Sequence, residues 1–184
     1  MTGRPRRAAR VGVGVASPVD LRLALADVPT SVAVVTTLDA GEPVGCTIGT
    51  FVPVSLDPPL VGYLAMVSSA TLRAVRRSRS FAVNVLAEEQ ADAGARFARP
   101  VGDRFRGVGW RQGPGGEPHL DGALVVLDCE VHDVVALGDH ELVVGRVVRV
   151  ERVPGATGLV FAGGRFRGQD GVQLRSAPAS SRAS

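Results

Sequence analysis

Three hydroxyl side chains stand where a helix is expected to begin. Ser68, Ser69 and Thr71 follow an apolar run at residues 60–66 and open a segment of helical character at residues 69–78. The first turn of a helix has unpaired backbone N–H groups and a partial positive charge, so it binds phosphate readily, and hydroxyls there add donors. The same spacing also fits a plain helix cap with surplus serine. On spacing alone, a phosphate site and a cap both stay open.

A second candidate segment, residues 43–60 (PVGCTIGTFVPVSLDPPL), combines glycines with short hydroxyl side chains. Glycine leaves a strand backbone open to close approach, and Thr47 and Thr50 supply short donors on either side of Gly49. Such a surface suits a flat polar ring better than a hydrophobic core. The alternative is a strand whose small residues have no binding role.

Two short motifs bring charge or a titratable ring to loops. Residues 102–105 read Gly-Asp-Arg-Phe, and residues 138–140 read Gly-Asp-His before a long apolar segment. Taken alone, the first is a loop with an exposed charge, and a histidine at a turn is more often polar surface than catalytic. We interpret His119 and His132 as polar surface and keep His140 as a candidate functional residue.

The elements that would position these residues are mostly strands. Turn residues at 39–42 and 137–139 join neighbouring strands as hairpins, which argues against a parallel sheet with alternating helices. We therefore predict a mainly β protein, an antiparallel barrel with a few helices packed outside. The expected strands are residues 31–38, 43–51, 60–66, 81–86, 123–136 and 140–153, and the expected helices start at Ser17-Pro18, Ser69 and Glu88.

Composition bounds the class of protein. A chain of 184 residues with 45% hydrophobic residues fits one domain, which we place at residues 17–170, between a disordered arginine-rich start (1–16) and a disordered tail (171–184). All 21 basic residues are arginine, and the net charge is +3. The charge excess comes from the two ends, so it gives no support for a nucleic-acid-binding face on the folded body, and we expect no nucleic-acid partner.

The cysteines and the hydropathy pattern exclude other classes. Cys46 and Cys129 are far apart and lack C-x-x-C spacing, so we expect neither a metal site nor a disulfide framework. No run of 18 apolar residues is present, so we expect no membrane span. Two free thiols suit a reducing compartment, and we expect a cytoplasmic protein.

Together these segments resemble the flavin reductase family, over about residues 18–166. The resemblance implies an FMN-binding split barrel, that is, an antiparallel split β-barrel with a few peripheral α-helices. It also implies a homodimer that reduces free FMN, with FAD possible, at the expense of NAD(P)H. Reduced flavin would then diffuse to a partner monooxygenase. Hydride passes directly between the two cofactors, so the protein would supply geometry and exclusion of water.

The resemblance also implies a role for each candidate residue. The serines and threonine at 68–71 would hold the flavin phosphate, and residues 47–50 would face the ring. His140 would be the catalytic residue that positions the nicotinamide. The implied cofactor-binding residues are Thr47, Ile48, Gly49, Thr50, Ser68, Ser69, Thr71, Arg104, Phe105 and Arg165.

Several positions depart from the family pattern, among them Val67, Gly49, Ala162 and Gly163. The last two replace an aromatic residue and an arginine, which would thin one wall of the pocket. Two alternatives therefore stay open. One is a split-barrel oxidoreductase that keeps its flavin and acts directly on an organic substrate. The other is a non-catalytic flavin- or haem-binding protein, with one of the three histidines as axial ligand.

Overall fold

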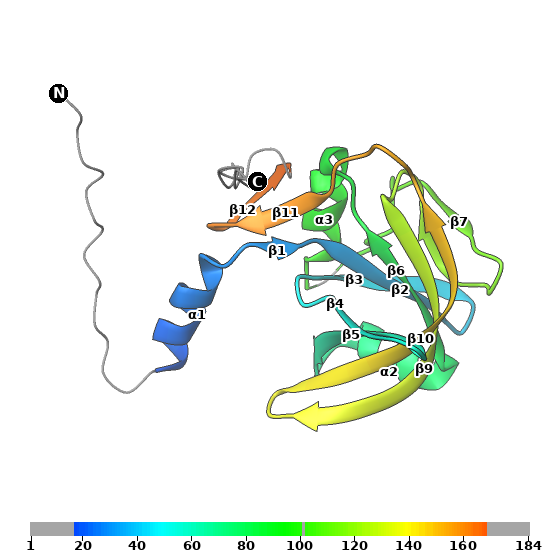
Figure 1. Cartoon of the computed structure of the whole chain (residues 1–184), viewed down its shortest axis with the longest axis horizontal. Helices are drawn as coiled ribbons and strands as arrows, with labels where there is room; N and C mark the ends of the chain where they lie inside the picture. Colours follow the sequence, from blue (N-terminus) through cyan, green and yellow to red (C-terminus); the bar gives the residue numbers. More distant parts are fainter. Residues whose placement is uncertain (1–16, 101, 169–184) are drawn as a thin grey trace, which may run out of the picture.

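A seven-stranded antiparallel sheet forms the centre of the computed structural model, which describes residues 17–100 and 102–168 (Figure 1). The segments expected to be disordered, 1–16 and 171–184, lie outside the described residues. The strand order is β3-β2-β6-β9-β10-β5-β4. The strands are β2 (Ala33–Asp39), β3 (Glu42–Ile48), β4 (Val52–Leu56), β5 (Pro59–Met66), β6 (Ser80–Val85), β9 (Val125–Leu137) and β10 (His140–Arg152).

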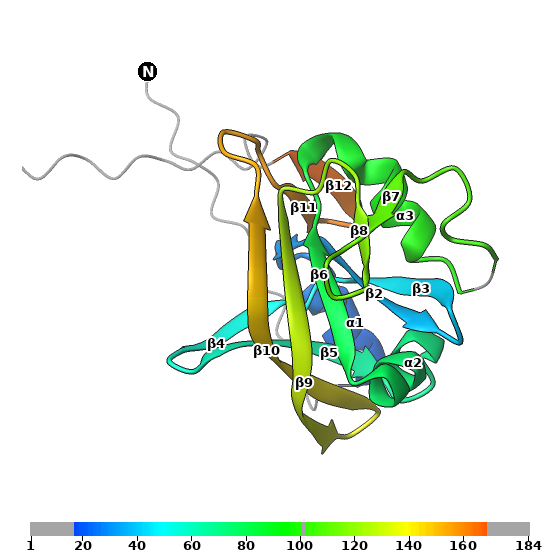
Figure 2. The same cartoon turned by 90° about the vertical axis from the view of Figure 1, so that its right-hand side faces the viewer.

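Short elements surround this sheet (Figure 2). They are the helices α1 (Pro18–Ala26), α2 (Ala70–Ser78), η1 (Glu88–Gln90) and α3 (Ala91–Phe97), and the strands β1 (Thr30–Ser31), β7 (Trp110–Gln112), β8 (Pro118–Leu120), β11 (Leu159–Ala162) and β12 (Arg165–Gly168). The mainly β prediction with few helices is confirmed. In the described residues the sheet stays open, with β3 and β4 at its edges.

Strand β2 is buried on both faces, which explains its unbroken apolar sequence. Successive side chains of a strand point to opposite faces. Val35 joins one core cluster, which includes Leu72 of α2, whereas Val34 joins another, which includes Phe97 of α3 and Phe105. The sheet is therefore covered by α2 on one side and by α3 with the 102–110 loop on the other. This arrangement brings the 102–105 loop beside the first half of β3, where Arg104 reaches the Gly45 carbonyl.

A buried polar cluster fastens the β7–β8 hairpin to the sheet. Thr36 donates a hydrogen bond to the Pro118 carbonyl, the Leu120 N–H donates to Asn84, and the ring of His119 lies 2.5 Å from the carboxylate of Asp128. His119 is 1% exposed, so its interpretation as polar surface was wrong. Its burial depends on sheet contacts that the sequence around it does not reveal.

The tautomer of His119 follows from its neighbours. Arg111 Nη1 lies 3.3 Å from Nδ1 of the ring, and a guanidinium can only donate. Nδ1 therefore accepts, Nε2 carries the proton, and Nε2 donates to Asp128 Oδ1. The buried carboxylate of Asp128 also has Arg149 Nη1 3.7 Å away.

Replacing Asp128 with alanine is expected to lower the free energy of unfolding by roughly 1–3 kcal/mol, because the N–H of His119 loses its buried acceptor. Urea denaturation followed by circular dichroism measures this loss. Glu130→Ala is the control, because Glu130 is exposed on the same strand. Equal losses for the two variants would show that the Asp128–His119 bond contributes nothing of its own.

Helix α1 begins as the sequence predicts but packs against little. Ser17 accepts a hydrogen bond from the Asp20 N–H and Pro18 occupies the first turn. No residue of α1 is buried, and its large apolar side chains are between 53% and 66% exposed. The Ala26 carbonyl at its end accepts a bond from the Gly163 N–H. In Figure 1 the helix stands away from the sheet.

Two further findings concern the described ranges as a whole. None of the helices within 17–100 and 102–168 is long and apolar enough to cross a membrane. These ranges also contain no group of three or more His, Cys, Asp or Glu side chains that could hold a metal ion.

Candidate functional site

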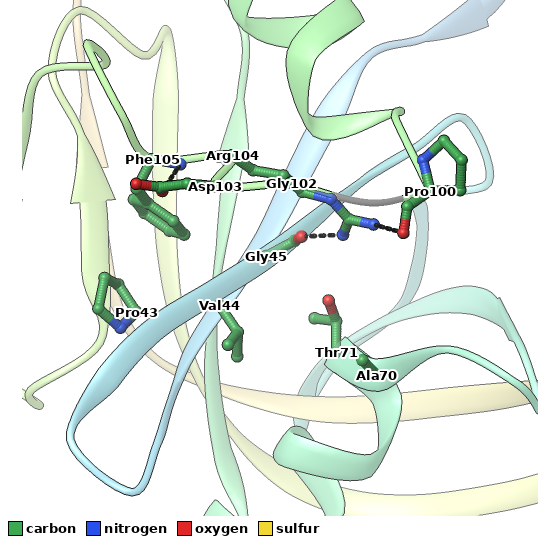
Figure 3. A pocket seen from close by; sticks show the side chains of 10 residues that line it. All are labelled: Pro43, Val44, Gly45, Ala70, Thr71, Pro100, Gly102, Asp103, Arg104 and Phe105. Carbon is green, nitrogen blue, oxygen red and sulfur yellow. Dashed lines mark hydrogen bonds between the residues drawn. The ribbon is translucent and has the colours of Figure 1, made fainter.

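A cleft of about 250 Å³ opens between β3, the start of α2 and the loop that follows α3 (Figure 3). Thr71 lies on one side of it and the guanidinium of Arg104 on the other. Ser69 caps α2 by accepting a hydrogen bond from the Leu72 N–H, and Thr71 is almost fully buried. The helix therefore presents its N-terminal end, with its partial positive charge, beside the cleft.

The loop at 102–105 is held in one conformation by its own residues. Asp103 Oδ1 accepts hydrogen bonds from the N–H groups of Phe105 and Arg106, both at 3.1 Å. Phe105 is buried and packs edge-on against Phe97 at 4.9 Å and against Trp110 at 5.7 Å. This packing fixes the backbone from which the side chain between Asp103 and Phe105 extends.

Arg104 lines the cleft as a fixed cation. Its Nη1 donates to the Gly45 carbonyl at 2.6 Å and its Nη2 to the Pro100 carbonyl at 3.2 Å. Both acceptors are neutral backbone carbonyls, so they do not balance the positive charge of Arg104. This charge lines the cleft opposite the N-terminal end of α2. A cation and a helix N-terminus across one space are the chemistry of an anion site, and a phosphate suits both.

Cys46 lies close to Thr71 and Arg104, which line this cleft, although no sequence motif indicates a role for it. Burial raises the pKa of its thiol, and hydrogen bonds with Thr71 and Ser69 and the charge of Arg104 oppose that effect. The thiol therefore stays protonated and is not a nucleophile at neutral pH. The alternation of β3 carries the only sequence signal, because Cys46 must face away from its neighbour Thr47.

Part of the glycine- and threonine-rich segment faces a second cleft, of about 180 Å³. Thr47 donates a hydrogen bond to the Gly94 carbonyl of α3 at 2.7 Å. A β-carbon at Gly49 would lie 2.8 Å from Thr30 Oγ1, so glycine is what allows this close approach. The lining residues are Thr30, Val32, Thr47, Ile48, Gly49, Ala98, Phe161 and Phe166.

The predicted binding residues therefore divide between two clefts. Thr71, Arg104 and Phe105 line the first, and residues 47–49 line the second. Thr50 lies beyond the end of β3, where its hydroxyl accepts from the Leu64 N–H and donates to the Leu64 carbonyl. The first cleft borders residues 43–45 and the second residues 47–49, along the same edge strand, so a ligand that runs along β3 would contact both groups.

Ser68 is exposed at the start of α2, and its carbonyl accepts a bond from Arg73 at 2.8 Å. His140 begins β10 directly across the ladder from Met66, and the Val67 N–H donates to the Asp139 carbonyl. The histidine turn thus lies beside the segment that leads into α2.

The ring of His140 is oriented by the residue before it. Its Nδ1 lies 2.7 Å from Asp139 Oδ1, and its side chain is 39% exposed. The hydrogen bond with His140, followed by the charge of the ring, lowers the pKa of Asp139. Asp139 therefore stays a carboxylate beside the ring.

Arg165 is exposed on β12 and lines neither of these two clefts. Its hairpin turns through Gly163 and Gly164, whose φ angles are +57° and +74°. Two consecutive positive φ angles favour glycine, so the glycine at 163 is explained by this tight turn. The expectation that Gly163 thins a pocket wall stays a prediction.

Comparison with known proteins identifies the family. The model of the flavin reductase like domain matches residues 25–170, and the chain belongs to this family. Among curated relatives, the flavin-dependent monooxygenase reductase subunit HsaB of Rhodococcus jostii (strain RHA1) is 37% identical over 161 residues, covering 88% of this chain and 83% of that protein. The NADH-dependent FAD reductase of Streptomyces globisporus is 39% identical over 154 residues, covering 81% and 84%.

Solved structures agree. The NADH:FAD oxidoreductase SgcE6 of Streptomyces globisporus C-1027, in complex with NAD and FAD fragments, superimposes with a TM-score of 0.79 at 35% identity, covering 91% of this chain and 99% of that one. Some relatives are longer. The chain spans 65% of the stachydrine N-demethylase reductase subunit Stc3 and 48% of a probable flavin reductase, both of Rhizobium meliloti (strain 1021).

Proposed function

We propose that the protein is an NAD(P)H-dependent flavin reductase that supplies reduced FMN or FAD to a partner monooxygenase in the cytoplasm. The first cleft carries this proposal, because it sets the start of α2 against the Arg104 guanidinium at the place where the family resemblance puts a flavin phosphate. The reductase subunits and the NADH-dependent FAD reductase among its relatives support the same activity.

The residues fit the parts of a flavin. We assign its phosphate to Thr71, Ser68 and Ser69 with Arg104, since these combine hydroxyls, helix N–H groups and a cation. The ring would lie along residues 47–50, where β3 ends and backbone donors are accessible. Phe105 would pack behind the phosphate site, and Arg165 and His140 would contact the nicotinamide nucleotide. Hydride transfer belongs to the two bound nucleotides, and the protein orients them and keeps water away.

Oxidation of NADH and NADPH, followed at the nicotinamide absorbance with and without added FMN or FAD, tests the activity. Turnover that requires free flavin and saturates in it is the expected result. An absence of turnover despite tight flavin binding would sink the reductase proposal.

The assembly we propose is a homodimer of split barrels. The bonds between Thr50 and Leu64 already draw the end of β3 toward β5, as a curled sheet requires. Exposed apolar side chains provide the surface for a second copy. They lie on α1 (Val19, Leu21, Leu23 and Leu25), on β4 (Val52, Val54 and Leu56) and on β10 (Val148 and Val150).

One observation favours a second candidate function. The second cleft holds the aromatic rings of Phe161 and Phe166 beside residues 47–49, and this apolar space would suit an organic substrate. A flavin that survives gel filtration and is reoxidised by such a substrate would favour this flavin-retaining oxidoreductase. If the flavin elutes free of the protein, this result would favour the diffusible-flavin reductase over the flavin-retaining enzyme.

Replacing His140 with alanine is expected to lower kcat about five- to tenfold, because one hydrogen bond that orients the nicotinamide is lost. Affinity for FMN should stay within twofold. Steady-state kinetics and a flavin titration measure the two quantities. His132→Ala is the matched control, because His132 is exposed elsewhere on β9. An unchanged kcat for His140→Ala would show that this histidine is a polar surface residue with no role in turnover.

A further inference from the structure

Four arginines surround a pocket of about 210 Å³ beside the first cleft. Arg96 comes from the last turn of α3 and Arg99 follows that helix, whereas Arg104 and Arg106 come from the loop after it. The sequence analysis gave a role only to Arg104. The other arginines reach the same space because α3 ends where the loop turns back.

The charge in this pocket is unbalanced. Asp103 is its one acidic lining residue, and an oxygen of that carboxylate already accepts two backbone bonds. Within residues 17–100 and 102–168, no carboxylate forms an ion pair with Arg96, Arg99 or Arg106. The paired arginines are elsewhere, as Arg76–Glu141, Arg77–Asp39, Arg111–Glu151 and Arg149–Asp128.

Like charges held around one space repel each other, and an anion between them removes that cost. The carbonyl end of α3 accounts for Arg96, since cations are favourable at a helix C-terminus. The carbonyl end of α3 does not explain why Arg99 and Arg106 line the same pocket. Guanidinium groups bind phosphate through paired N–H donors, so a phosphate is the anion that suits this pocket.

The pocket adjoins the first cleft, because both are lined by Gly102, Asp103 and Arg104. Resting on the proposed function, we propose that the arginine pocket binds the second phosphate of a dinucleotide, the adenylate phosphate of FAD. FMN ends at the phosphate assigned to the first cleft. FAD continues from that phosphate directly into a second one, so the pocket makes the protein favour FAD.

The test replaces both Arg99 and Arg106 with alanine and measures Kd for FAD and for FMN by isothermal titration calorimetry. Two lost charged contacts are expected to weaken FAD binding about tenfold, with FMN binding within twofold. Arg146→Ala is the control, because Arg146 is exposed on β10, outside both pockets. A double Arg→Lys variant, which keeps the charge, should recover part of the FAD affinity.

The same phosphate chemistry could come from the 2′-phosphate of NADPH, so KM for NADPH and for NADH is measured on the same variants. A rise in KM for NADPH alone would overturn the assignment to FAD. Equal weakening of FAD and FMN, or no change in either, would also overturn it. Because Kd needs no turnover, a protein that binds FAD through these arginines but oxidises no NAD(P)H would refute the proposed activity and leave this inference standing.

Discussion

An Arg104→Met variant is expected to bind FMN about 30-fold more weakly than the wild type, while its affinity for riboflavin changes less than threefold. A hydrogen bond to a charged group contributes about 2 kcal/mol, which corresponds to about this factor. Arg104 faces the proposed phosphate site from a position fixed by the Gly45 and Pro100 carbonyls. Methionine keeps much of the aliphatic stem and removes the charge. Titration with the two flavins, which differ by one phosphate, measures the effect.

Riboflavin is the internal control in this experiment, and the thermal midpoint shows whether the loop still folds. Equal losses for FMN and riboflavin would mean that Arg104 acts by holding residues 100–104 in place rather than by contacting phosphate. The Arg99 and Arg106 double variant separates the role of the neighbouring pocket from that of Arg104. It should weaken the binding of FAD and leave the binding of FMN unchanged.

Replacing Leu21 and Leu25 with aspartate is expected to convert a homodimer into monomers at micromolar concentration. These side chains lie four residues apart on α1 and are both more than half exposed in a single copy. Burying a leucine side chain is worth about 1.5–3 kcal/mol, and an unpaired carboxylate in its place opposes burial altogether. Light scattering after gel filtration measures the mass in solution.

Arg22→Asp is the matched control on the same helix, because it changes charge without removing an apolar side chain, and it should remain dimeric. A dimer that persists in the leucine variant would show that α1 is not at the interface. A wild-type monomer would refute the proposed dimer itself.

Local sequence predicted the elements whose signals are local. The Ser17-Pro18 helix start, the Ser69 cap and the β2–β3 hairpin through residues 39–42 are all found in the structure. β4 was missed because Pro53 suggests a break. It is an edge strand, where a proline can be tolerated because one side of the strand needs no N–H donor.

Contacts between residues distant in sequence determine the features that local sequence did not predict. Residues 110–112, which are not among the expected strands, form β7, because partners distant in sequence, such as Asn84 and Asp128, anchor its hairpin. The proposed phosphate site at the start of α2 could be suggested from its hydroxyls alone. Cys46 could not, since its place beside Thr71 depends on how α2 packs over β3. Likewise, no spacing rule brings Arg99 and Arg106 into one pocket.

The edge-on contact between Trp110 and Phe105 gives the protein a built-in optical reporter. Trp110 is the only tryptophan in the chain, and its ring packs against Phe105, the residue that follows Arg104. Its indole emission, excited selectively over the single tyrosine, therefore comes from one known place. Since oxidised flavin absorbs in the range where indole emits, occupancy of the cleft can be followed by energy transfer in the unlabelled protein.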